Sequence, residues 1–243
     1  QGLMAGINAA LSIQGREPVV LDRSEAYIGV LIDDLVTKEN HEPYRMMTSR
    51  AEYRLLLRQD NADLRLSKKG YEIGLISKER YDWVCKKEEL IQQEIARVAT
   101  VRIGANKEVQ ALLESYGSIP LNTGTTLTEL IRRPELDYEK LAPIDKERPE
   151  LPYDVVEQVN INIKYDGYIS RQIKQVESFK RLEKKVIPEH FNYDEVPSLR
   201  IEARQKLKLY NPMSIGQASR ISGVSPADIS VLLVYMEQLK YQQ

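Results

Sequence analysis

Residues 77–98, SKERYDWVCKKEELIQQEIARV, carry the clearest periodicity in the chain and decide the fold class. Their apolar side chains recur at helical spacing, with lysine and glutamate between them: Tyr81, Val84, Leu90, Ile91, Ile95 and Val98. Positions three and four residues apart lie on one face of an α-helix. The segment therefore predicts a long amphipathic helix. Cys85, next to Val84, is expected to pack on its apolar side as a small hydrophobic residue.

Helical patterns also cover most of the remaining sequence. Further helices are expected at residues 1–15, 49–57, 61–74, 107–116, 126–132, 154–186, 198–209, 214–221 and 225–239. The pattern at 154–186 is interrupted at Gly167. Strand signals are few and fall at residues 19–21, 28–32 and 101–103. Residues 1–15 have no initiator methionine and no capping residue before them, so we expect the natural polypeptide to continue upstream.

These patterns predict a mainly α fold that is divided at proline-rich connections. The prolines that punctuate the middle of the chain are Pro134, Pro143, Pro149 and Pro152, and a domain boundary is expected there. The expected parts are a tail at 1–24, an arginine-rich connecting segment at 25–75, a helical region at 76–150 and a C-terminal helical domain at 151–243. The last of these is expected to end in a tip at 198–243.

The bulk composition is that of a folded soluble protein, with 42% hydrophobic and 29% charged residues. The formal net charge is -1, so any site for a polyanion must be a local patch. A single cysteine fits a reducing compartment, and a cytoplasmic location is expected. The longest apolar stretch, near residues 229–236, is far shorter than the roughly 20 residues that a membrane-spanning helix needs, so no membrane association is expected.

Motifs for catalysis or cofactor binding are missing from the sequence. It has no G-x-G-x-x-G, no P-loop and no G-x-S-x-G, and no carboxylate pair can be assigned acid and base roles. The two histidines, His41 and His190, lie far apart without the spacing of metal ligands. No catalytic residue and no metal site are therefore expected.

Residues 42–58, EPYRMMTSRAEYRLLLR, form the strongest local feature. Ser49 and Glu52 predict a capping box that opens a helix. In that helix Arg50, Arg54 and Arg58 would line one face, with Arg45 before it and Arg65 beyond. Arginine suits phosphate because its planar fork binds two oxygens. The alternative is a solvated face whose arginines pair with Glu52, Asp60 and Asp63.

Residues 214–230 have the helix, glycine turn and capped second helix of a helix-turn-helix unit. Taken alone, this pattern indicates a stand-alone nucleic-acid-binding or adaptor protein. The second helix, however, is apolar on nearly every face and has no arginine or lysine before Lys240. A helix that reads a DNA groove needs polar and basic side chains at its front. DNA binding is therefore not expected, and we expect this helix to be buried against protein.

Five stretches in a fixed order resemble the GidA/MnmG family of tRNA-modifying flavoproteins. They are residues 1–10 (QGLMAGINAA), 27–35 (YIGVLIDDL), 42–66, 164–172 (KYDGYISRQ) and 214–234. The resemblance implies an enzyme that binds FAD in an α/β domain and uses NADH. It also implies that this enzyme works as a homodimer with the GTPase MnmE to add a 5-carboxymethylaminomethyl group to the wobble uridine of tRNA. Residues 1–24 would then end the FAD-binding domain, and no cofactor is expected on the present chain alone.

The resemblance also assigns roles to particular side chains. It makes Arg45, Arg50, Arg54, Arg58 and Arg65 the first candidates for tRNA binding. Lys164, Arg171 and Lys174 are secondary candidates, because they could instead neutralise Asp166 and Glu177 along their own helix. The tip would bind the GTPase through Met213, Ile215, Ile229, Leu232, Leu233 and Met236. The competing interpretation is that this last group is simply the core of the tip.

Overall fold

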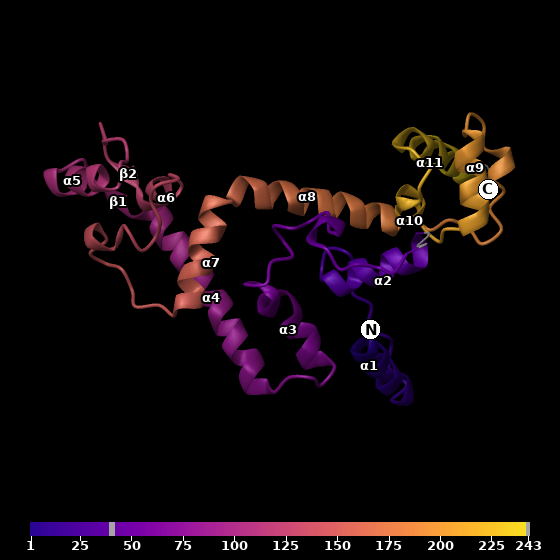
Figure 1. Ribbon diagram of the computed structural model, residues 1–243, viewed down its shortest axis with the longest axis horizontal. Coiled ribbons are helices and arrows are strands. Elements are labelled where there is room, and N and C mark those ends of the chain that lie inside the picture. The colour runs from indigo at the N-terminus through magenta and orange to yellow at the C-terminus, as the bar shows by residue number, and fades with distance from the viewer. Residues whose placement is uncertain (39–41, 242–243) are drawn as a thin grey trace. The chain divides into compact units, whose positions relative to one another are not determined.

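The structure is a computed structural model that describes residues 1–38 and 42–241, with side chains as far as Leu239 (Figure 1). The described residues form eleven α-helices, three short 3-10 helices and one two-stranded sheet. The expectation of a mainly α fold is confirmed. The chain divides into two compact units, Leu55–Ser170 and a second one made of Gln1–Arg54 with Arg171–Gln243. The expected boundary at 150/151 therefore does not separate the units, because the proline-rich stretch packs inside the first of them.

The unit at residues 55–170 is built around the helix that the periodicity predicted. This helix is α4 (Lys78–Thr100), and Ser77 caps it by accepting a hydrogen bond from the Arg80 amide at 3.3 Å. Helices α3, α6 and α7 pack against it. The remaining elements are α3 (Ala62–Glu72), β1 (Arg102–Ile103), α5 (Lys107–Ser115), β2 (Thr125–Thr126), α6 (Leu127–Ile131), η2 (Ala142–Ile144) and α7 (Tyr153–Lys164). The strand expected at 101–103 is β1, which pairs antiparallel with β2.

A buried ion cluster joins three helices of this unit. The Lys87 side chain of α4 is 4% exposed, and its Nζ lies 2.9 Å from an Asp63 oxygen in α3 and 3.1 Å from an Asp154 oxygen in α7. Burial would lower the pKa of Lys87, but the hydrogen bonds that it donates to the two carboxylates outweigh burial and raise the pKa. The ammonium therefore stays charged, and the cluster fixes how α3 and α7 pack on α4.

Two expectations for this part of the chain need correction. The interruption expected at Gly167 is a full break two residues earlier: the backbone leaves helical geometry at Tyr165 (φ −105°, ψ 12°), and α8 (Asp166–Glu183) begins there as a separate helix. Cys85 is exposed rather than packed on the apolar side. It follows the buried Val84 directly, and one residue turns a helix by about 100°, which carries the thiol off the core face.

The second unit combines the first 54 residues with residues 171–243. Its elements are α1 (Gly2–Ile13), α2 (Tyr27–Thr37), η1 (Thr48–Arg50), the larger part of α8, η3 (Tyr193–Glu195), α9 (Ile201–Tyr210), α10 (Ile215–Arg220) and α11 (Pro226–Tyr241). Helices α9, α10 and α11 form the tip around a core that includes Ala203, Leu207, Ile215 and Leu232. The same core also includes Ile187, Tyr193 and Val196, which precede the expected start of the tip at residue 198.

The expected strands in this unit are also wrong. Residues 28–32 belong to α2, where Gly29 lies so close to the Leu21 and Asp22 carbonyls that a Cβ would sit 2.4 Å from each oxygen. Residues 19–21 form no described strand. The Val19 backbone instead bonds to the Asn8 side chain in α1, through its amide at 2.7 Å and its carbonyl at 3.1 Å. A side chain of α1 thus replaces the strand partner.

Candidate nucleic-acid interface

Residues 42–54 form a loop and not the helix that Ser49 was expected to open. Helical geometry is limited to the single turn of η1, after which Ala51 is extended (φ −90°, ψ 130°). Ala51 and Tyr53 are buried while Glu52 and Arg54 are exposed. Alternate burial of this kind requires an extended backbone. The expected capping box does not form, because the Glu52 carboxylate reaches Arg23 instead of the start of η1.

The partner of Glu52 is a buried guanidinium group. Arg23 is 4% exposed, and its Nη2 lies 2.6 Å from Glu52 Oε1. Its Nη1 lies 2.6 Å from Asp34 Oδ1 and 2.9 Å from Asp33 Oδ2. Burial would lower the pKa of Arg23, but the hydrogen bonds that it donates to Glu52 and Asp34 outweigh burial and raise the pKa. The side chain is therefore a permanent buried cation that holds the loop against α2.

Asp34 has the opposite charge in the same cluster and is fully buried. Burial alone would raise its pKa, but hydrogen bonds from Lys38, Arg23 and Tyr44 outweigh it and lower the pKa below the ordinary value of 3.8. The Tyr44 hydroxyl donates to Asp34 Oδ2 at 2.8 Å. Burial and this bond to a carboxylate raise the pKa of Tyr44 to about 12. Tyr44 and Glu52 thus anchor the loop near both of its ends.

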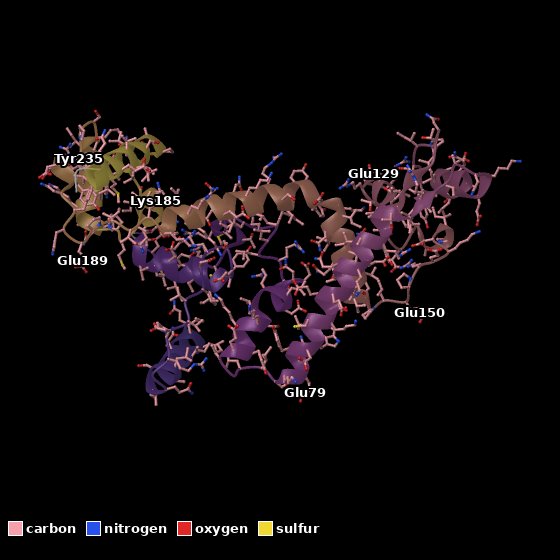
Figure 2. The ribbon with its side chains drawn as sticks, turned by 180° about the vertical axis from the view of Figure 1, so that it is seen from behind. Glu79, Glu129, Glu150, Lys185, Glu189 and Tyr235 are labelled. Carbon is pink, nitrogen blue, oxygen red and sulfur yellow. The ribbon has the colours of Figure 1, made fainter. Side chains whose placement is uncertain are left out.

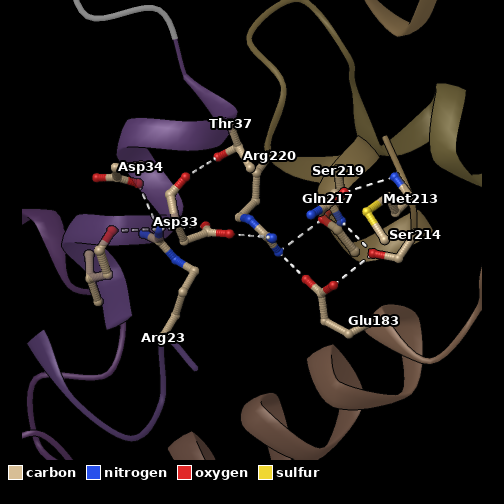
Figure 3. A network of polar contacts seen from close by, with 12 residues as sticks. Arg23, Asp33, Asp34, Thr37, Glu183, Met213, Ser214, Gln217, Ser219 and Arg220 are labelled. Carbon is tan, nitrogen blue, oxygen red and sulfur yellow. Dashed lines mark hydrogen bonds and ion pairs between the residues drawn. The ribbon is translucent and has the colours of Figure 1, made fainter. Parts of the chain in front are cut away.

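The cluster continues to the tip through Asp33 and Arg220 (Figure 3). Arg220 Nη2 lies 2.9 Å from the second oxygen of Asp33, and Arg220 Nη1 binds the Glu183 carboxylate at the end of α8. The Arg220 guanidinium also lies 4.9 Å from the centre of the Phe179 ring. The Glu183 side chain lies close to Gly216: a Cβ at position 216 would lie 2.4 Å from its carboxylate, which would have to shift. One chain of charges therefore joins the loop, α2, α8 and the tip.

Three of the five expected arginines lie on the surface of the loop. Arg45, Arg50 and Arg54 are exposed, and the Arg50 guanidinium lies 5.0 Å from the centre of the Tyr44 ring. None of the three forms an ion pair with another residue that the structure describes. The carboxylates that were expected to neutralise them bind elsewhere: Glu52 binds Arg23, Asp60 binds Arg58 and Asp63 binds Lys87.

Arg58 and Arg65 have internal roles, which corrects the expected row of arginines on one helical face. Arg58 Nε lies 3.0 Å from Asp60, and Arg58 Nη2 donates to Gln158, a buried residue of α7, at 3.1 Å. Arg65 Nε donates to Asn61 Oδ1 at 2.9 Å, and its Nη2 donates to the Arg58 carbonyl at 3.0 Å. Both side chains order the loop that precedes α3.

The secondary candidates for tRNA binding, Lys164, Arg171 and Lys174, also differ in their exposure. Lys164 Nζ lies 3.5 Å from the Pro134 carbonyl and is partly buried. Arg171 and Lys174 are exposed on α8 and form no ion pair with any side chain in the described part of the chain. Asp166, one of the carboxylates that could have neutralised them, binds Arg132 at 3.1 Å.

The six side chains expected to bind a partner do not share one surface. Ile215 and Leu232 have no exposed area and Ile229 is 7% exposed, so these three form the core of the tip and a partner cannot reach them. Leu233 and Met236 pack partly buried against the same core. Only Met213 of the six is well exposed, at 72%. The core interpretation therefore holds for most of the group.

Two family models match the chain. One is described as the tRNA modifying enzyme MnmG/GidA C-terminal helical domain and matches residues 78–173; the other, the C-terminal helical bundle of the same enzyme, matches residues 175–243. The chain belongs to the MnmG/GidA family. The two matches meet within α8, close to the boundary between the compact units.

Individual members of the MnmG/GidA family match nearly the whole chain. It is 68% identical over 240 residues to the tRNA uridine 5-carboxymethylaminomethyl modification enzyme MnmG of Lachnoclostridium phytofermentans, covering 99% of this chain and 38% of that protein. It is 62% identical to MnmG of Clostridium kluyveri, with 98% and 38% covered. The crystal structure of Aquifex aeolicus GidA in form II superposes with a TM-score of 0.78 at 42% identity, covering 97% of this chain and 37% of that one. The chain spans about 38% of the length of the curated relatives it matches.

The described residues contain neither a candidate membrane-spanning helix nor a candidate metal site. No helix in the described part of the chain combines the length and apolar character needed to cross a membrane. Among the described side chains, no group of three or more histidine, cysteine, aspartate or glutamate residues could hold a metal ion. His41 lies outside the described residues.

The first prediction concerns Arg23. Arg23→Met removes the cation but leaves Asp34 buried, and breaking a buried pair in this way costs about 3–5 kcal/mol. We expect the free energy of unfolding to fall by that amount in urea titrations followed by circular dichroism. Arg45→Met is the matched control: because Arg45 is exposed, this substitution should change the free energy of unfolding by less than about 0.5 kcal/mol. Equal, small effects of both substitutions would contradict the assigned role of Arg23.

The second prediction concerns acid stability. The pKa of Asp34 is lowered in the folded chain, so its stabilisation is present above the ordinary value of 3.8 and is lost as pH falls through the folded pKa. We expect Asp34→Asn to flatten the dependence of unfolding free energy on pH below about pH 4. Exposed Asp82, changed to Asn, is the control. A slope that Asp34→Asn leaves unchanged would show that Asp34 is not held ionised by Arg23.

Proposed function

We propose that the chain is the tRNA-binding and partner-binding region of the flavoenzyme that, with the GTPase MnmE, adds the 5-carboxymethylaminomethyl group to the wobble uridine of tRNA. The observation that carries the proposal is the exposed trio Arg45, Arg50 and Arg54, which we call the arginine loop. It is held in place by the Arg23 cluster and has no carboxylate partner among the described residues. The relatives from Lachnoclostridium phytofermentans and Clostridium kluyveri are named as tRNA uridine 5-carboxymethylaminomethyl modification enzymes.

Phosphate is the ligand that best suits the arginine loop. The chain has 35 basic and 36 acidic residues, so its overall charge does not attract a polyanion. An exposed group of arginines that forms no ion pair with a described residue is a local exception to that balance. Arginine binds phosphate oxygens in pairs, and contacts to the phosphate backbone position a folded RNA without reading its bases. We therefore assign the arginine loop to positioning of the tRNA.

The described residues do not fit a flavin. A dinucleotide cradle groups glycines where a strand turns into a helix N-terminus. The glycines with positive φ here, Gly15, Gly74, Gly117 and Gly223, are isolated from one another, and the first three follow the C-terminal ends of helices. We assign no step of flavin or nicotinamide chemistry to this chain. For the complete protein, we propose FAD and NADH as cofactors, a homodimer and a cytoplasmic location.

A stand-alone DNA-binding function is not favoured by the geometry of the tip. The front of the would-be recognition helix α11 holds Asp228, which is 2% exposed and lies 2.6 Å from Arg200 Nη2. The hydrogen bonds from Arg200 outweigh burial and lower the pKa of Asp228. A buried carboxylate therefore occupies the position where a DNA-binding helix presents polar and basic side chains.

For the GTPase partner, we assign the docking surface to the exposed apolar side chains beside α10. Met213 is 72% exposed and Leu209, near the end of α9, is 68% exposed. Met213 also borders a groove of about 260 Å³ that is lined by Val36, Tyr210, Pro212 and Ile221. Val36 in this groove is also 72% exposed, and exposed apolar side chains beside a groove favour a protein partner. We centre this surface on Met213 and leave out Leu233 and Met236, because these two side chains pack against the core.

The third prediction tests the arginine loop. In the complete protein, replacing Arg45, Arg50 and Arg54 by Ala should weaken binding of several tRNAs to a similar degree, because phosphate contacts carry no sequence information. The slope of log K against log salt should also fall by about 2–3, roughly one per lost contact. The measurement is tRNA binding by fluorescence anisotropy at several salt concentrations. Triple substitution of Arg102, Lys107 and Lys146 by Ala, all exposed, is the charge-matched control. Unchanged affinity and slope would remove the arginine loop from the tRNA-binding surface.

The fourth prediction separates an interface from a core. Met213→Asp should abolish capture of the GTPase in a pull-down while leaving the helical circular dichroism signal intact. Leu232→Asp buries a charge in the core of the tip and should reduce that signal itself. Partner capture by Met213→Asp at the wild-type level would show that the GTPase binds elsewhere.

A further inference from the structure

A second line of basic side chains runs along α8. Positions 171, 174, 178 and 181 recur at spacings of three and four residues, so they lie on one helical face. Three of these positions are basic (Arg171, Lys174 and Arg181) and the fourth is Ser178. All four are exposed, and we call them the α8 stripe. Side chains stand out from α8 along its length in Figure 2, and Lys185, labelled there, continues the line just beyond the helix. Lys185 itself binds Glu237 at 3.3 Å.

The charge of the α8 stripe is not compensated within the helix. The ion pairs of α8 join it to residues outside the helix: Asp166 binds Arg132, Lys180 binds Asp22 and Glu183 binds Arg220. Glu177 lies on the shoulder of the stripe, three residues after Lys174 and four before Arg181, but forms no ion pair with a described residue. Residues 171–185 contain six basic and two acidic residues, so the excess of positive charge is local.

An exposed helix of this composition would ordinarily relieve its charges by pairs at three- and four-residue spacing. In the described residues of α8 no such pair forms, and like charges face each other at Arg171 and Lys174. The face on the other side is partly buried and holds Val176 and Phe179. The stripe is therefore turned outward, and an external anion would relieve its repulsion.

We propose that the α8 stripe follows the phosphate backbone of a double-helical stem of the bound RNA. The eleven residues from Arg171 to Arg181 span about 15 Å along the helix axis, which is ten rises of about 1.5 Å. Each strand of a duplex carries one charge per nucleotide, about 3.4 Å apart along the axis in DNA, so this line can follow several successive phosphates. The stripe holds no aromatic side chain for stacking on unpaired bases, which favours a regular stem over a single strand. This inference rests on the proposed RNA-binding function and adds a contact line separate from the arginine loop.

The test replaces Arg171, Lys174 and Arg181 by Ala in the complete protein. The probes are a tRNA transcript and an RNA hairpin stem, and their binding is measured at several salt concentrations. We expect affinity for both probes to fall and the slope of log K against log salt to fall by about 2–3. A second variant with Arg171→Lys and Arg181→Lys keeps the charge and should bind both probes nearly as the wild type does. The Arg102, Lys107 and Lys146 triple variant is the matched control, and circular dichroism checks that every variant is folded.

The outcomes separate this inference from the proposed function. If the stripe variant binds both probes with wild-type affinity and slope while the arginine-loop variant is weakened, the stripe proposal is overturned and tRNA binding stands. If the wild type binds neither probe, both fail. If a DNA duplex of the same sequence competes as well as the RNA stem, the stripe is a general polyanion surface and the assignment to an RNA stem is overturned.

Discussion

The unit that carries the candidate site depends on one buried guanidinium group. Arg23 is removed from water, and a buried charge is tolerated only where its partners and hydrogen bonds are in place. Asp33, Asp34 and Glu52 supply them, the first two from α2 and the third from the loop. The position of Glu52 in turn makes the loop extended. Asp33 also forms an ion pair with Arg220, which connects the cluster to the tip.

This constraint explains how the arginines divide. A side chain such as Arg58, which finds a carboxylate and the buried Gln158 within its own unit, becomes part of the packing. Arg45 and Arg54 have no such partner among the described side chains and remain in solvent. The arginines that form the candidate surface are therefore those whose expected carboxylate partners already bind other side chains. Glu52 is the clearest case, because its choice of Arg23 leaves the neighbouring arginines uncompensated.

The sequence predicted the long helix α4 and the strand β1 well, because each depends on local spacing and local hydrogen bonds. It failed at Ser49 and Glu52, where a residue 29 positions away captured the carboxylate that would have closed the capping box. The one available signal was the pair Asp33 and Asp34 inside an otherwise apolar helix, since buried acids require a cation. The sequence could not identify Arg23 as that cation, because its choice is a tertiary contact. The same limit applies to the tip, where apolar periodicity alone did not separate the buried Leu232 from the exposed Met213.

Arginine footprinting with and without tRNA tests most directly whether the arginine loop is a phosphate-binding surface. The complete protein is treated with an arginine-specific dicarbonyl reagent, and modification of each residue is read by mass spectrometry. We predict that tRNA protects Arg45, Arg50 and Arg54. Exposed Arg102 should react equally with and without tRNA, and buried Arg23 should react slowly in both cases. Equal modification of the three loop arginines with and without saturating tRNA would contradict it.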